Sequence, residues 1–103
     1  MIYLDPPLWP AHGTVFSHLI SDSSLEELHD FAAAARIDPR AFDLDHYDVP
    51  VWMYDDLIAQ GAQPVSAGEL TRILIASGLR VKAKDRAAAY AAGKKEVPAR
   101  RAA

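Results

Sequence analysis

The stretch TVFSHLISDSSLEELHDFAAAA, residues 14–35, contains the two patterns that decide the fold. Its first half alternates as an extended strand does, with successive side chains on opposite faces. The two faces carry Phe16, His18 and Ile20 against Val15, Ser17 and Leu19. Because both faces are partly apolar, the pattern predicts a strand inside a sheet rather than at its edge.

The second half predicts a helix that begins at a capping box. Ser23-Ser24-Leu25-Glu26 has the S-x-x-E spacing in which two side chains satisfy free backbone N–H groups. Asp22 places negative charge where the helix dipole favours it. The apolar stripe follows at helical spacing and consists of Leu25, Leu28, Ala32 and Ala35. Pro39 ends the helix.

The remaining segments are shorter. Residues 1–5 (MIYLD) predict a strand that two prolines end, and residues 5–13 (DPPLWPAHG) predict a stiff loop. A short helical turn and an extended piece are expected over residues 40–48, and a second helix from Pro50 to Gly61. Residues 62–65 predict a strand, residues 66–78 a third helix with its own capping box, and residues 79–81 a last strand.

Alternating helices and strands joined by short loops are typical of parallel βα units. We therefore expect an α/β fold: a small single domain over residues 1–81, with three to four mostly parallel strands and about three helices. Residues 82–103 form a basic, Ala-rich tail that is expected to be helical in part or disordered.

Composition limits the class of protein. With 103 residues the chain forms one domain, and the absence of cysteine excludes disulfides, zinc fingers and thiol catalysis. No apolar run approaches the length of a membrane span, and the N-terminus has neither the basic nor the apolar region of a signal peptide. We expect a cytoplasmic protein without a membrane partner.

The net charge of −3 conceals an asymmetry. Residues 1–81 carry twelve acidic and four basic side chains, whereas residues 82–103 carry two acidic and seven basic ones. An acidic body repels a phosphate backbone, so nucleic acid would be bound only through the tail, if at all. The simpler interpretation is that the tail is a solvated terminus.

Polar residues collect where a parallel sheet places its ligands, outside the carboxyl ends of the strands. Asp5 and Asp22 follow the first two strands, and the stretch DLDHYDVP follows at residues 43–50. The question is whether that stretch is a reactive site or only a polar connection.

A divalent metal is the first candidate ligand, because imidazole and carboxylate together suit zinc, manganese or iron. Asp5, His18, His46 and Asp48 are the predicted ligands, with His12 and Asp45 as further donors. His46 and Asp48 are two positions apart and share one face of an extended chain. The chain lacks the strong metal signatures, however. The structural alternative makes His18 a core histidine and Asp48 the cap of the next helix.

The same four residues, Asp5, His18, His46 and Asp48, are the candidates for acid–base catalysis. The predicted ligand-binding side chains are Trp9, His12, Asp22 and Tyr47. Trp9 would stack on a ring or, alternatively, cover an edge of the core. Neither a P-loop nor a dinucleotide fingerprint is present, and there is no G-x-S-x-G.

Three longer stretches, YLDPPLWPAHGTVFSHLISDSSLEELHDFA, DHYDVP and GAQPVSAGELTRILIASGLR, resemble a small bacterial and phage domain family of unknown function. The resemblance covers roughly residues 2–81 in order and leaves out the tail. It implies a bacterial or phage cytoplasmic protein and draws attention to His29 besides the residues named above. It supplies no activity and no catalytic residue.

Three functions follow as hypotheses, and the sequence does not decide whether the chain is an enzyme. The first is a metal-assisted hydrolase that acts on a phosphate ester, resembling a nuclease or phosphohydrolase. The second is a non-catalytic module that binds a nucleotide or another small anionic ligand. The third is a protein-interaction module, for which partly apolar helix faces in a short chain also make a homodimer a reasonable expectation.

Overall fold

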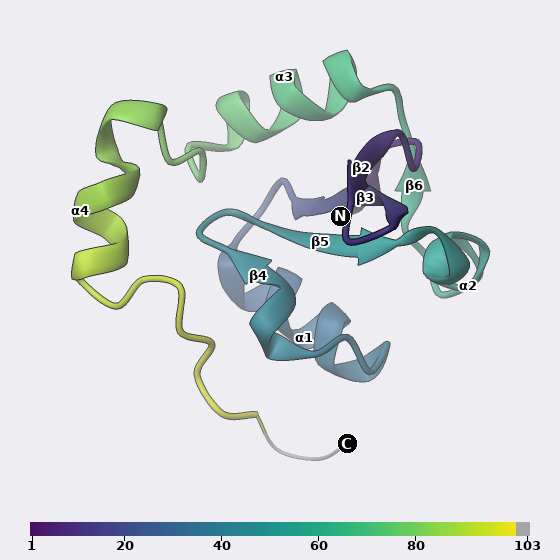
Figure 1. Cartoon of the computed structure of the whole chain (residues 1–103), viewed down its shortest axis with the longest axis horizontal. Helices are drawn as coiled ribbons and strands as arrows, with labels where there is room; N and C mark the ends of the chain where they lie inside the picture. Colours follow the sequence, from purple (N-terminus) through teal and green to yellow (C-terminus); the bar gives the residue numbers. More distant parts are fainter. Residues whose placement is uncertain (101–103) are drawn as a thin grey trace.

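The computed structural model describes residues 1–100; residues 101–103, the end of the predicted tail, lie outside the described residues. The strands are β1 (Ile2–Leu4), β2 (Trp9–Ala11), β3 (Thr14–Ser21), β4 (Phe42–Asp43), β5 (His46–Pro50) and β6 (Gln63–Pro64). The α-helices are α1 (Leu25–Ala34), α2 (Tyr54–Ala59), α3 (Ala67–Ser77) and α4 (Arg86–Ala91). The 3₁₀ turns are η1 (Pro39–Ala41), η2 (Val51–Met53) and η3 (Ala83–Asp85). They form a small compact domain with one mixed sheet (Figure 1).

The sheet is mostly antiparallel, so the prediction of mostly parallel strands was wrong, and the α/β class holds only in general. The strand order is β4-β5-β3-β1-β6, with β2 paired to β3 outside this path. The central strand β3 is antiparallel to β1, β2 and β5, and within residues 1–100 only β1 and β6 pair in parallel. The predicted strand at residues 62–65 is confirmed as β6, next to β1.

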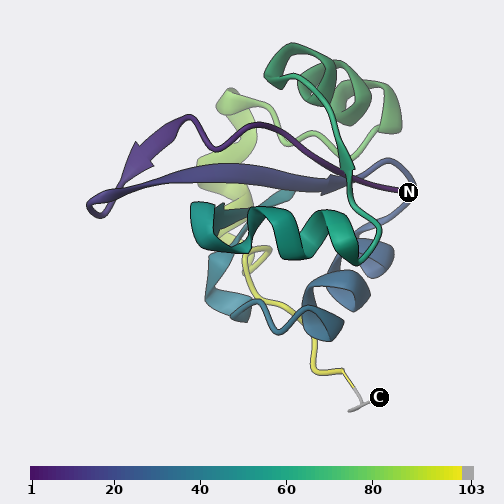
Figure 2. The same ribbon diagram turned by 90° about the vertical axis from the view of Figure 1, so that its right-hand side faces the viewer.

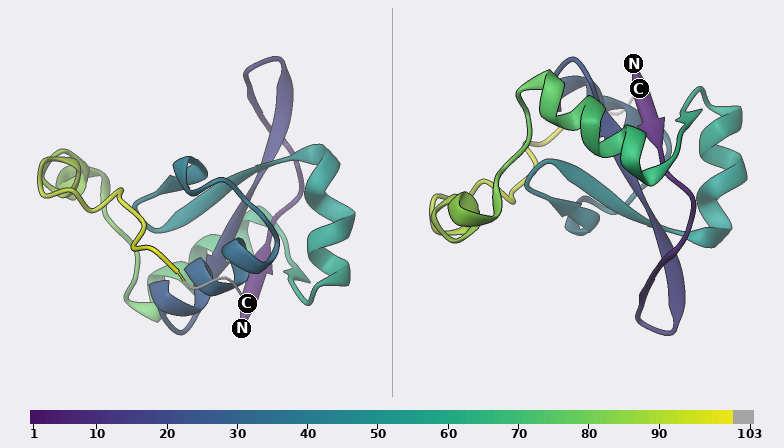
Figure 3. Two further views of the ribbon diagram at one scale, coloured as in Figure 1. Left: turned by 90° about the horizontal axis from the view of Figure 1, so that it is seen from below. Right: turned by 90° about the horizontal axis from the view of Figure 1, so that it is seen from above.

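A tight turn explains the antiparallel arrangement. His12 and Gly13 both have positive φ, 47° and 78°, as the two-residue turn of a β-hairpin requires. Residues 9–11, predicted as part of a stiff loop, are therefore strand β2, and the chain reverses into β3. Figure 3 shows this hairpin extending beyond the rest of the molecule.

The stretch at residues 43–50 is also a hairpin. Phe42 pairs with Tyr47 across β4 and β5, and Leu44 has a φ of 68° in the connection. Of the helical turn and extended piece predicted over residues 40–48, the turn is confirmed as η1. The extended piece consists of two strands, β4 and β5, with a turn between them. Pro50 is the last residue of β5, and the helical region starts at Val51. Asp48 lies inside β5, so the alternative in which it caps the second helix was wrong.

Caps define the two longest helices. Helix α1 is capped by Ser24, whose side chain accepts from the Glu27 N–H, so the predicted capping box is displaced by one residue. For α3 the predicted Ser66 cap is confirmed, with its side chain accepting from the Glu69 N–H. Gly78 ends α3 in the left-handed region, as predicted.

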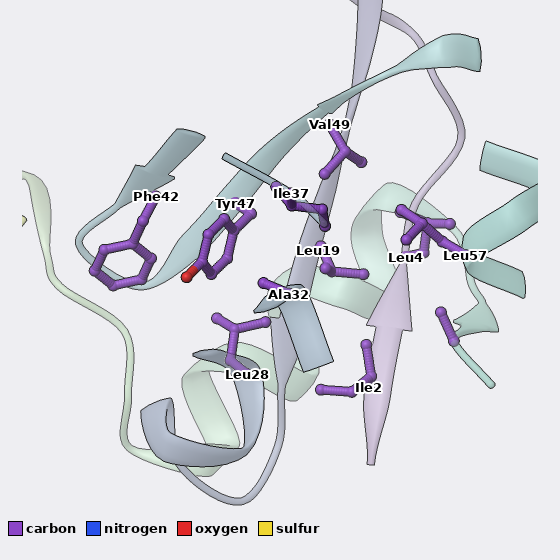
Figure 4. Packing of buried hydrophobic residues seen from close by; sticks show 11 residues of the cluster. Ile2, Leu4, Leu19, Leu28, Ala32, Ile37, Phe42, Tyr47, Val49 and Leu57 are labelled. Carbon is purple, nitrogen blue, oxygen red and sulfur yellow. The ribbon is translucent and has the colours of Figure 1, made fainter. Parts of the chain in front are cut away.

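The sheet has helices on both faces (Figure 2). Helices α1 and α2 cover the larger core, which includes Leu4, Leu19, Leu28 and Tyr47 (Figure 4). Helix α3 covers the other face through Leu70 and Leu74, which pack against Ile20. Leu19 and Ile20 thus point to opposite cores, as the alternating pattern and the interior position of this strand predicted.

Residues 79–100 run along the body of the domain. Residues 79–81, predicted as a last strand, are not in a strand. After α4, at the left of Figure 1, Lys95 Nζ donates to the backbone carbonyls of Arg40 and Phe42. Arg100 then contacts Glu26 on α1, with an Nη2–Oε2 distance of 3.1 Å.

Candidate functional site

Three side chains of types that can ligate a metal converge on the face of the sheet that α3 partly covers. His18 lies directly opposite Asp48 in the β3–β5 register, and His46 lies two residues before Asp48 on the same face of β5. One ligand atom from each of His18, His46 and Asp48 lies within 4.8 Å of the others. We call these three residues the HHD cluster. The pleat of two antiparallel strands is what brings them together.

His46 is held from behind by Asp45. Its Nδ1 lies 2.7 Å from Asp45 Oδ1, and Asp45 Oδ2 accepts the backbone N–H of Val81 at 2.8 Å. Asp45 is only 1% exposed. Because an ionised carboxylate can only accept, Nδ1 of His46 must carry a proton.

His18 is held in the same manner by Asp5. Its Nδ1 lies 2.9 Å from Asp5 Oδ2, and its backbone N–H donates to Asp5 Oδ1 at 2.6 Å. Trp9 Nε1 donates to Asp5 Oδ2 at 3.1 Å. Asp5, 1% exposed, therefore uses both oxygens, and it fixes the ring of His18 and the indole of Trp9 together.

The consequence is that both imidazoles turn their Nε2 atoms toward one carboxylate. Asp48 Oδ1 is 3.2 Å from His46 Nε2 and 3.8 Å from His18 Nε2. The two histidine rings meet edge to face, with centroids 5.1 Å apart. Two carboxylates behind the histidines and one in front enclose a small region that favours positive charge.

The pKa values respond to this arrangement. Burial lowers the pKa of His46, but the hydrogen bonds to Asp45 and Asp48 raise it by more, so that it lies at about 9. Burial raises the pKa of Asp45 and of Asp48, but the hydrogen bond of each with His46 and the other donors and positive charges around it together lower it by more. Both pKa values are therefore below the ordinary value. In the metal-free protein a proton on His46 supplies the positive charge.

A divalent ion could take the place of that proton. Zinc bound at 2.0–2.1 Å by tetrahedral ligands needs neighbouring ligand atoms about 3.3 Å apart. The two distances to Asp48 Oδ1, 3.2 and 3.8 Å, are close to this value. Two imidazoles and one carboxylate leave a coordination position free, as in catalytic zinc and iron sites. A carboxylate behind a ligating histidine is the usual second layer of a metal site.

Two cavities adjoin the HHD cluster. His18 and His46 line one of about 370 Å³, together with Thr71, Arg80 and Arg86. Asp48 lines the other, of about 440 Å³, whose walls include Phe16 and Tyr90. Trp9 lies on the border and lines both.

The structure brings together most of the predicted metal ligands. His18, His46 and Asp48 form the cluster, whereas Asp5 lies one layer behind it and holds His18. His12 is exposed at the turn between β2 and β3; it lines the larger cavity but does not belong to the cluster.

Two predicted ligand-binding residues lie elsewhere. Tyr47 points to the opposite face of the sheet, where it is 1% exposed and its hydroxyl lies 2.7 Å from Nδ1 of the buried His29. Burial raises the pKa of Tyr47 to about 12. Asp22 is at the far end of β3, because β3 is antiparallel to β1, and it binds the N-terminal ammonium at 2.9 Å.

One part of the site was not predicted from the sequence. Residues 82–103 were expected to form a basic tail, helical in part or disordered, but no contact of its helix with the site was expected. Arg86 donates to Asp43 Oδ2 at 2.8 Å, and the hydroxyl of Tyr90 donates to Asp43 Oδ1. These contacts dock α4 beside the β4–β5 hairpin. The i, i+4 spacing of Arg86 and Tyr90 on one helix face was the only sequence signal for this arrangement.

The geometry defines the chain as a small mixed-sheet domain with a histidine–carboxylate cluster on one face. Residues 2–77 match a family described as "Protein of unknown function (DUF4031)", and the chain belongs to this family. This confirms the resemblance to a small family of unknown function. Neither the curated proteins nor the solved structures contain a match. In the described part of the chain, every helix is too short or too polar to cross a membrane.

Proposed function

We propose that the HHD cluster binds a divalent metal ion and that the protein uses it to hydrolyse a phosphate ester. A bound ion of this kind would act as a Lewis acid and lower the pKa of a water molecule. Zinc, iron(II) and manganese(II) are the ions that two imidazoles and a carboxylate suit best.

One observation carries the proposal. Each histidine donates a hydrogen bond from Nδ1 to a buried carboxylate, and both Nε2 atoms then face the same oxygen of Asp48. Two neutral imidazoles would present lone pairs to that oxygen, which is unfavourable. The arrangement needs positive charge between the rings and Asp48, supplied by protons or by a metal ion.

The smaller cavity supports a phosphate ester as the substrate class. Arg80 and Arg86 line it together with the two histidines, and both guanidinium groups can bind phosphate oxygens. Thr71 on α3 adds a hydroxyl to the same wall. Arg80 and Arg86 would neutralise the charge of the ester and orient it toward the cluster.

Tryptophan fluorescence gives a direct test of metal binding. The chain has two tryptophans, and the ring of Trp9 lies 5.1 Å from that of His18, whereas Trp52 is 71% exposed on η2. In the Trp52→Phe protein, Co²⁺ bound at the cluster should quench Trp9 strongly, and EDTA should reverse the quenching.

Variants of the cluster make this test specific. His46→Gln and Asp48→Asn, each in the Trp52→Phe background, should abolish the saturable quenching. Asp55→Asn is the matched control, because Asp55 is an exposed carboxylate on α2. Equal quenching in all four proteins would overturn the metal site. Hydrolysis of bis-(p-nitrophenyl) phosphate and of p-nitrophenyl phosphate by the metal-loaded protein then tests the reaction.

A binding module without catalysis is the second candidate, and one observation favours it. Asp5 is the only carboxylate among the described residues that line the smaller cavity, and both its oxygens are occupied by hydrogen bonds. No free carboxylate of this wall can therefore serve as a general base. Tight binding of phosphate or phosphonates without turnover of either ester would select this function.

A further inference from the structure

The larger of the two cavities beside the HHD cluster also has the features of a binding site. Asp48 lines the larger cavity of about 440 Å³, whereas His18 and His46 line the smaller one. A ligand held at the cluster is therefore next to both cavities. Trp9 forms the border between them.

Trp9 is an exposed aromatic residue with a fixed orientation. It is 45% exposed, yet its Nε1 donates to the buried Asp5, and its ring packs on His18. The exposed part of the Trp9 ring is therefore held in one position beside the cluster. Trp52 provides the contrast, because it is 71% exposed and its indole N–H has no partner in the described residues.

The larger cavity is lined by apolar groups on the side of Trp9. Pro10 and Phe16 stand beside it on the β2–β3 hairpin, and Ala41 closes the wall from η1. A flat ring is the ligand shape that an indole and a neighbouring phenyl group accommodate best.

We propose that the ligand is a phosphate ester that carries an aromatic ring, as a nucleotide does. Its phosphate lies at the HHD cluster with Arg80 and Arg86, and its ring stacks on Trp9 in the cavity of about 440 Å³. This inference rests on the proposed function for the position of the phosphate, and it adds the recognition of the ring.

Two phosphonates that cannot be hydrolysed provide the test. Phenylphosphonate and methylphosphonate differ in the ring alone, and isothermal titration of the Co²⁺-loaded protein gives their dissociation constants. Stacking predicts that phenylphosphonate binds roughly 5- to 150-fold more tightly. Trp9→Leu should remove this preference, whereas Trp9→Phe retains an aromatic ring and should keep most of it. Trp52→Leu is the matched control and should leave the preference unchanged.

The outcomes separate this inference from the metal site. Equal affinity for the two phosphonates, no binding of either, or a preference that Trp9→Leu leaves intact would overturn the inference, although Co²⁺ quenching would still support the metal site. Absence of quenching would overturn the metal site. A phenyl preference that depends on Trp9 and persists in EDTA would then support ring recognition alone.

Discussion

The pH dependence of stability is the most direct consequence of the HHD cluster. In the metal-free protein the pKa of His46 lies at about 9, against an ordinary value of 6.5. A group whose pKa is raised by folding stabilises the protein fully below its unfolded pKa, and this contribution is lost as the pH rises through the folded pKa. We therefore expect stability to fall between about pH 6.5 and pH 9.

The size of the effect follows from the two pKa values. One pKa unit corresponds to about 1.36 kcal/mol, so the difference between 6.5 and about 9 gives about 3 kcal/mol for a side chain that is 15% exposed. In a domain of this size that amounts to roughly 12–24 °C in Tm. Thermal unfolding in EDTA from pH 6 to pH 9.5 measures it.

The variant His46→Gln separates this effect from other titrations. The N-terminal ammonium also has a raised pKa, because its hydrogen bonds to Glu27 and Asp22 favour the charged form, but it is present in both proteins. The difference in Tm between the wild type and His46→Gln should therefore shrink as the pH rises. Parallel curves over the whole range would refute the pairing of His46 with Asp45 and Asp48.

A bound metal ion should flatten this decrease of stability with pH. Binding requires deprotonated imidazoles, so the stabilisation by a divalent ion grows over the same pH range, and at a hundredfold excess over Kd it reaches about 2.7 kcal/mol. If Co²⁺ or Zn²⁺ leaves the pH profile of the wild type unchanged at saturating concentration, the HHD cluster is an ion pair and not a metal site.

Three further predictions concern other parts of the structure. Asp45→Asn should weaken Co²⁺ binding about 10- to 100-fold in a fluorescence titration, because Asp45 orients His46, and unchanged affinity would contradict that role. Leu19→Ala should cost about 2–5 kcal/mol in urea unfolding, because Leu19 is fully buried in the larger core; a loss under 1 kcal/mol would argue against that packing. Ser24→Ala should lower the free energy of unfolding by about 1 kcal/mol in the same assay, and by more than Ser23→Ala does, because Ser24 caps α1. A larger loss in Ser23→Ala would show that Ser23 is the cap, as the sequence predicted.

Local signals in the sequence determined much of the fold. The alternating pattern of residues 14–21 predicted a strand with two apolar faces, and Ser66 and Gly78 predicted the ends of α3. These features depend on residues within one or two turns of each other, so their physical cause is contained in the local sequence. That His46 and Asp48 share one face of a strand was predictable for the same reason, because they are two residues apart.

Only the tertiary structure decided the direction of the strands and the partners of the site residues. The turn at His12 and Gly13 makes β3 antiparallel to β1, which takes Asp22 away from the cluster. The register between β3 and β5 places His18 opposite Asp48. The second turn, at Leu44, lacks the Asn-Gly or Asp-Gly pair that marks such hairpins in a sequence.

The sequence by itself thus determined which histidines and carboxylates are candidates for the site and which strand faces they share. It did not determine that Asp5 and Asp45 would lie behind the two imidazoles or that α4 would dock beside β4. Pairings between residues such as Asp5 and His18, or Asp43 and Arg86, join segments 13 and 43 positions apart. Their geometry depends on how the strands are paired, and that choice is made by the packing of the whole sheet between its two helical layers.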